Sequence, residues 1–164
     1  MDVDPAMSIG EALLEAFKLI WEMYDDALEN IPVEHWRAGE IDYLIPARQV
    51  YHAVETADFY SGASPDDFPW GQRFDCGCFD SPPEGLPTRE QAREYHDEVR
   101  VKVSDWIRGL DAIEILAREK SFPWTGSVVL GRALYLLGHY RQHFGELNAE
   151  LRRRGLPRIK WTTH

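Results

Sequence analysis

Two histidines, His139 and His143, stand one helical turn apart and are the side chains best suited to chemistry in this sequence. Residues at positions i and i+4 of a helix share one face, so both imidazoles can bind the same divalent metal ion. Leu136 and Leu147 continue the same helical spacing, which places the pair on the face expected to turn toward a core. A buried imidazole needs partners for its ring nitrogens, and a metal supplies one. The pair predicts a metal site; the alternative is that each imidazole only bonds a backbone carbonyl or water.

A third ligand has to come from another part of the chain. His52 is the best candidate, because it lies in the middle of a predicted helix whose other core positions are apolar. His96, at the edge of the apolar stripe of a later helix, is the rival third or fourth ligand. Glu55 follows His52 by three residues and could orient a ligand or act as a base. The alternative for Glu55 is a solvated or capping carboxylate.

Three neutral imidazoles would leave open positions on a divalent metal, as in catalytic rather than closed structural sites. Such a metal lowers the pKa of bound water toward about 7, or binds and activates a thiolate. Zinc is the first choice, with nickel or iron also compatible, because imidazole ligands alone do not select among these metals.

Long amphipathic helices are expected to position these side chains. Capping-box patterns begin at Ser8 and Thr88, and apolar residues then recur every three or four positions. No segment has the pattern of a convincing strand. The predicted helices cover residues 9–30, 46–60, 89–118 and 127–154. The simplest architecture is therefore an all-α four-helix bundle.

Residues 61–87, between the second and third predicted helices, contain five prolines and four glycines, which exclude regular structure. The aromatic residues of this loop could bury area against the bundle or a second subunit, so we expect order and a homodimer. Whether the loop is a lid or a dimer contact stays open. The chain length fits a single domain over residues 8–158, with a flexible N-terminus at 1–7 and a C-terminal tail at 159–164.

The formal net charge of −10 argues against a nucleic acid or an anionic membrane as partner, since both would be repelled. The sequence has no run of eighteen apolar residues and no basic, then apolar, leader, so we expect a cytoplasmic protein. Cys76 and Cys78 are separated by one residue and are expected to be free thiols of a cytosolic loop. A redox or metal-handling role is the alternative.

The arrangement of these motifs resembles the DinB-like superfamily. The resemblance rests on His52 in the second predicted helix, the pair His139 and His143 in the last, the Phe-Gly-Glu-Leu of 144–147 and the Leu-Arg-Arg-Arg-Gly of 151–155. Members of that superfamily are four-helix bundles with a three-histidine metal site. The resemblance therefore implies that these three histidines are the metal ligands.

The sequence departs from the usual pattern of the superfamily at two places. Phe144 and Glu146 replace the more usual Arg and Gln, and Ile45 and Pro46 stand where many members have a helix-capping serine. Neither departure removes a ligand. Substrate assignment stays open.

Characterised members of the superfamily include transferases and isomerases that use small thiols. The resemblance thus implies a metal-dependent transferase or hydrolase, in which a low-molecular-weight thiol or water attacks an electrophilic substrate. The alternative is a non-catalytic, stress-associated module in which the metal stabilises the bundle or the protein only binds a ligand. Fold and metal ligands do not fix the reaction.

Overall fold

The computed structural model describes residues 8–77 and 79–163. Over these residues the fold is all-α, as predicted, with no strand and one isolated bridge between Arg118 and Val128. The predicted N-terminal segment 1–7, Cys78 and the final residue lie outside the described residues. The α-helices are α1 (Ile9–Asn30), α2 (Val33–Trp36), α3 (Pro46–Tyr60), α4 (Arg89–Arg108) and α5 (Val129–Arg153). Short 3₁₀ turns are η1 (Asp42–Leu44), η2 (Pro83–Gly85), η3 (Glu114–Leu116) and η4 (Pro123–Thr125).

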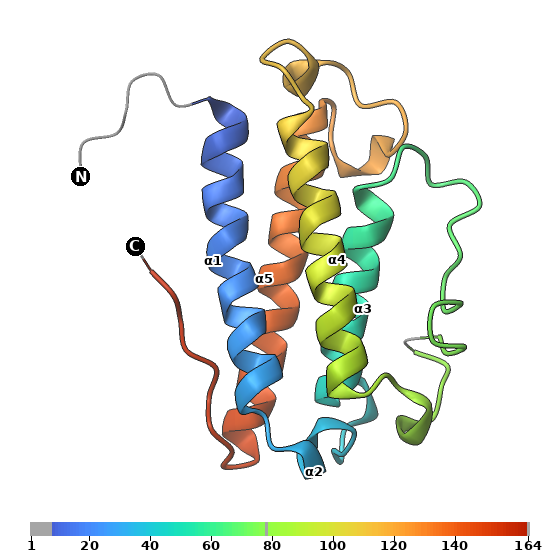
Figure 1. Ribbon diagram of the computed structural model, residues 1–164, viewed down its shortest axis with the longest axis vertical. Helices are drawn as coiled ribbons and strands as arrows, with labels where there is room; N and C mark the ends of the chain where they lie inside the picture. The colour runs from blue at the N-terminus through green and yellow to red at the C-terminus, as the bar shows by residue number, and fades with distance from the viewer. Residues whose placement is uncertain (1–7, 78, 164) are drawn as a thin grey trace.

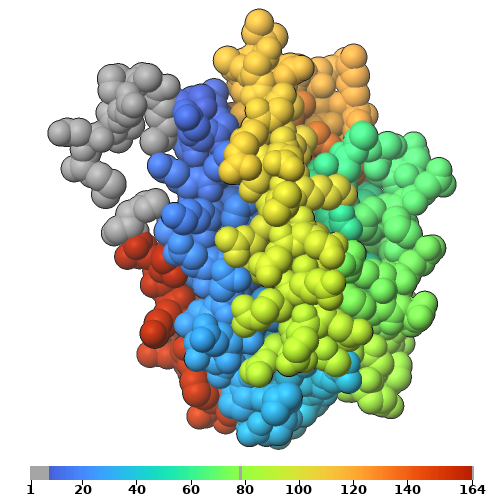
Figure 2. Space-filling model, viewed as in Figure 1, coloured from blue at the N-terminus to red at the C-terminus, as the bar shows by residue number. Residues whose placement is uncertain are grey.

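The four long helices lie side by side and enclose the core (Figure 1). Helix α3 packs on α4 and α5, and α1 packs on the same two helices. Large apolar side chains from all four fill the centre, including Phe17, Tyr51, Val103 and Tyr140, each almost fully buried. The 61–87 segment, green in Figure 2, covers the edge of the molecule beside α4. None of the helices in the described ranges is long and apolar enough to cross a membrane.

Local signals in the sequence set three of the helix starts. Ser8 Oγ accepts the N–H of Glu11 while the Glu11 carboxylate accepts the N–H of Ser8, which forms a complete capping box for α1. Thr88 and Gln91 form the same reciprocal pair at α4. Pro46 occupies the first turn of α3, where its missing N–H is not needed.

The predicted third helix was too long. Helix α4 ends at Arg108, not near residue 118, and Gly109 follows as its cap. The Asp111 carboxylate then accepts the N–H groups of Ile113 and Glu114, both at 2.7 Å. Such side-chain bonds compete with the helical ladder and begin the separate turn η3. Ile113, an apolar residue within the predicted helix 89–118, is consequently 81% exposed.

A buried ion pair stabilises the 109–128 connection between α4 and α5. Arg132 Nε lies 3.1 Å from Glu119 Oε2, and both side chains are almost completely buried. The other Glu119 oxygen accepts the N–H groups of Ser121 and Phe122. The Arg132 guanidinium lies over the rings of Trp106 (4.5 Å) and Phe122 (4.8 Å). The pair therefore ties the irregular 109–128 connection to the first turn of α5.

Candidate metal centre

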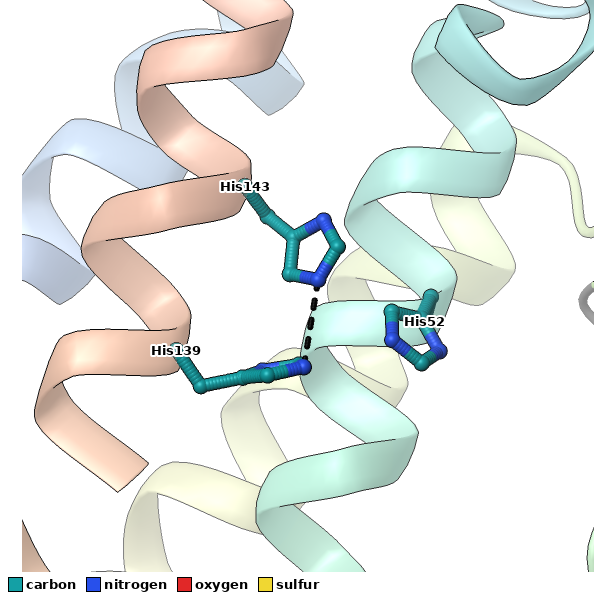
Figure 3. Close-up of side chains that lie close together, drawn as sticks. All are labelled: His52, His139 and His143. Carbon is teal, nitrogen blue, oxygen red and sulfur yellow. Dashed lines mark hydrogen bonds between the residues drawn. The ribbon is translucent and has the colours of Figure 1, made fainter. Parts of the chain in front are cut away.

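Three histidine side chains converge between α3 and α5. His52 projects from α3 toward His139 and His143, which project from consecutive turns of α5 (Figure 3). The Nε2 atoms of His139 and His143 are 3.1 Å apart. The His52 ring centroid lies 5.0 Å from that of His139 and 4.7 Å from that of His143. Each residue offers one nitrogen, and the three nitrogens lie within 4.8 Å of one another.

This spacing fits a single metal ion. Two tetrahedral ligand nitrogens, each about 2.0–2.1 Å from zinc, lie about 3.4 Å apart. The Nε2 atoms of His139 and His143 are already near that separation. The ligand atom of His52, a partly buried residue, lies within 4.8 Å of the other two. The group could therefore hold a divalent ion.

Gln49 fixes the orientation of His143. The Gln49 side-chain amide donates from Nε2 to the Tyr43 carbonyl (2.8 Å), which turns its Oε1 toward His143 Nδ1 at 2.7 Å. His143 Nδ1 therefore carries the proton and donates, with Glu146 Oε2 also nearby at 3.3 Å. The Nε2 lone pair of His143 is then directed at His139, as a metal ligand requires.

Burial keeps the three imidazoles neutral. Desolvation, reinforced by the neighbouring histidines, lowers the pKa of His52 to about 3. Desolvation and the proximity of His143 lower the pKa of His139 to about 4. Burial also lowers the pKa of His143, although Glu146 opposes that shift. Since metals bind the neutral ring, the site is in its ligand form at neutral pH without displacing protons.

In metal-free protein, stability is expected to fall as the pH is lowered from about 7 to about 5. The folded-state pKa values of His52 (about 3) and His139 (about 4) lie below the ordinary 6.5, so in this range the unfolded chain binds more protons than the folded one. The contribution of these two histidines to the free energy of unfolding is fully present above about pH 6.5. It is lost as the pH falls from about 6.5 toward their folded-state pKa values. Urea unfolding with a chelator at a series of pH values measures the effect. A variant with all three histidines replaced by glutamine should respond less, and an equal response would contradict the explanation.

A cavity of about 260 Å³ adjoins His52. Its lining comes from α3, through His52 and Glu55, and from five residues of the 61–87 loop. Glu55 is buried, and its Oε1 accepts the Tyr51 hydroxyl (3.0 Å) and the Gly71 N–H (2.7 Å). Glu55 therefore holds the loop against α3 and contributes to the wall of the cavity.

Residues 16–147 match the family model of the DinB superfamily. The chain belongs to the DinB superfamily. The matched segment includes His52, His139 and His143, together with α3, α4 and most of α5. No match was found among curated proteins or among solved structures.

His96 does not join the histidine cluster of this DinB superfamily protein. Its ring is completely buried between α4 and α1, where Nε2 lies 3.5 Å from Asp25 Oδ1 and the ring stacks on Tyr24. The three-histidine group does not include it. His96, the rival ligand considered from the sequence, therefore lies outside the histidine cluster. His52 is the third member of that cluster.

Gln49 and Glu146 are the site residues that sequence reasoning did not identify as partners of His143. Glu146 lies three residues after His143, so helical spacing alone could have indicated it. Gln49 is 94 positions away in the chain, although it precedes His52 by three residues on α3. The sequence signal available for Gln49 was its place one helical turn before the candidate ligand His52.

Replacing Gln49 with leucine is expected to weaken metal binding by about 10–100-fold, because His143 would lose the acceptor that holds its ring and tautomer. Competition titration of Zn²⁺ or Co²⁺ against a chromophoric chelator measures the affinity. Gln142→Leu is the matched control, since Gln142 is an exposed glutamine on α5 whose side chain donates to Glu146 Oε1 at 3.3 Å. Unchanged affinity in Gln49→Leu would show that the hydrogen bond does not position the ligand.

Proposed function

We propose that this DinB superfamily protein is a metal-dependent enzyme in which His52, His139 and His143 hold a divalent ion. Zinc is our first assignment, and nickel or iron suit the same ligands. The reaction we propose is attack by a small thiol or by water on an electrophilic substrate, as in a thiol S-transferase or a hydrolase. A bound metal would supply Lewis acidity that lowers the pKa of the thiol or water.

The observation that carries this proposal is a three-membered histidine group beside a cavity. Within the described residues the group offers three protein ligands, which leaves coordination positions for a reactant. His52 belongs both to the group and to the cavity lining, so a molecule in the cavity would lie next to the metal. A closed structural site would need neither feature.

Glu55 is assigned to the substrate side of the site. Its carboxylate lies one turn after His52 and belongs to the cavity lining. In that place it can accept a proton from a reactant or pair with a positive group of the substrate. The hydrogen bonds from Tyr51 and Gly71 fix the position of its carboxylate.

Metal analysis of untagged protein, followed by a thiol transfer assay, tests the proposed activity. With 1-chloro-2,4-dinitrobenzene as electrophile and a panel of small thiols, the metal-loaded protein should accelerate conjugation, and chelation should abolish the acceleration. Esters offered in place of this electrophile, with water as the nucleophile and no thiol added, test the hydrolase form. A protein that binds metal stoichiometrically but accelerates none of these reactions would favour the non-catalytic alternative, a metal- or ligand-binding module with a structural metal.

We propose further that the four long helices form the four-helix bundle typical of the family and that the 61–87 loop acts as a lid. The cavity favours a lid over a dimer contact, since five of its seven lining residues come from that loop. A homodimer remains a prediction, and light scattering tests it. The single domain over 8–158 with a tail at 159–164 is likewise a prediction.

A further inference from the structure

We propose that the cavity beside His52 binds the positively charged amine of a small substrate, with the Glu55 carboxylate as its counter-ion. This inference rests on the proposed metal-dependent function and names the class of molecule that the site would accept. The reacting group of that molecule would reach the histidine cluster while its amine stays in the cavity.

The charge of the cavity is the first support. Two of its seven lining residues, Glu55 and Asp80, carry carboxylates, and none is a lysine or an arginine. The third titratable lining residue, His52, is one of the three proposed metal ligands. Glu55 is only 2% exposed, so water screens its charge poorly. Both charged side chains of the lining are therefore acidic, and an ammonium group in the cavity would find a carboxylate on the side away from the proposed metal.

Aromatic rings provide the second support. Trp70 and Phe79 both line the cavity, and each is about half exposed, at 46% and 47%. Trp70 packs against Phe59, with ring centroids 4.8 Å apart, and Phe79 packs against His52 at 4.5 Å. The faces of such rings attract ammonium groups through their quadrupole. A carboxylate combined with aromatic rings is a typical setting for an organic cation.

The backbone of the loop fixes the position of the cavity lining next to Glu55. Gly71 has φ +72°, and a Cβ at that position would lie only 3.0 Å from Gly77 N and from the Cys76 carbonyl. Two segments of the loop therefore approach each other backbone to backbone. Only glycine, which has no Cβ, permits this close approach at position 71. The N–H of Gly71 donates to Glu55 at 2.7 Å and so holds the carboxylate in the wall.

The separation of the two groups indicates the size of the ligand. His52 and Glu55 are three residues apart on α3, which is roughly 4.5 Å along a helix axis. An amine and a thiol joined by two carbons span a similar distance. We therefore choose a short aminothiol as the probe, with its sulfur directed at the histidine cluster and its ammonium group at Glu55.

Thiol binding to cobalt-loaded protein tests this inference. Cysteamine, 2-mercaptoethanol and mercaptoacetate have similar sizes and carry a positive, a neutral and a negative end group. Titration of each thiol is followed by the thiolate-to-cobalt charge-transfer absorption, in wild type and in Glu55→Gln. Because the thiols differ in their own acidity, the ratio of dissociation constants between variant and wild type is compared for each one.

We expect Glu55→Gln to weaken cysteamine binding about tenfold or more, the usual effect of losing a charge-assisted contact. The affinity for 2-mercaptoethanol should stay the same, and that for mercaptoacetate should stay the same or increase. Glutamine retains an oxygen that can accept the Tyr51 and Gly71 hydrogen bonds, so the wall should survive. Glu94→Gln removes one exposed carboxylate outside the cavity lining and controls for net charge. Asp80→Asn tests the second carboxylate of the cavity.

Two contrary results have different meanings. If cobalt binds but none of the thiols produces the absorption, thiol activation at this metal is wrong, and the inference falls with it. If all three thiols bind and Glu55→Gln and Asp80→Asn change their affinities equally, the amine site is wrong while the proposed function stands.

Discussion

Replacing His143 with alanine is expected to lower metal affinity by more than about 100-fold while the protein stays folded. His143 offers one of the two nitrogens already at ligand spacing, so its loss removes more than the 10–100-fold effect of a supporting residue. The core does not depend on the site, because the four long helices bury a continuous set of apolar side chains. Metal titration and thermal unfolding followed by circular dichroism measure the two effects.

Wild-type protein in a chelator is the control for that variant. If the metal is catalytic, the chelated protein should still unfold cooperatively, at a somewhat lower temperature. If the metal is structural, its binding energy is part of the folding energy, and chelation should remove the helical signal. Collapse of the helical signal in both samples would refute the enzyme proposal and support the structural alternative.

Replacing Glu119 with alanine is expected to destabilise the protein by about 3–5 kcal/mol, the usual effect of leaving one partner of a buried ion pair alone. Arg132 would keep its charge among Trp106 and Phe122 without a carboxylate. Two N–H groups of the 119–122 turn would also lose their acceptor. Urea unfolding measures the loss in free energy.

The exposed pair of Arg73 and Glu98 provides a matched comparison. Glu98→Ala removes a carboxylate from a pair that water surrounds, so the expected loss is about 1 kcal/mol or less. A double variant, Glu119→Leu with Arg132→Met, should recover much of the stability lost in Glu119→Ala. Equal losses for Glu119→Ala and Glu98→Ala would show that burial of the first pair has no energetic consequence.

Most of the helices could be predicted from the sequence because their signals are local. The predicted range 9–30 coincides with α1, and 46–60 coincides with α3. The end of α4 could not be placed, since apolar spacing continues after Gly109 while the Asp111 side chain takes the backbone N–H groups that would extend the helix. When a side chain competes with the backbone carbonyls for helical N–H groups, the pattern of hydrophobic residues does not change. The competition therefore cannot be detected from that pattern.

The candidate site was predictable only in part, for a similar reason. His139 and His143 are neighbours on one helix, so their spacing places them together. The contact between Gln49 and His143 depends on how α3 and α5 are aligned, which no local pattern specifies. The cavity depends on the path of the 61–87 loop, where the Gly71 N–H donates to the Glu55 carboxylate. Irregular segments have no periodicity from which such a path could be read.

The placement of the three histidines on α3 and α5 also determines when the site can form. His52 is synthesised before the helix that carries His139 and His143. The pair on α5 alone offers two ligands, and the third becomes available only after α3 and α5 have packed together. Binding of a metal ion by all three histidines would therefore follow the packing of α3 on α5. Uptake of such an ion would then distinguish molecules in which these two helices have packed from molecules in which they have not.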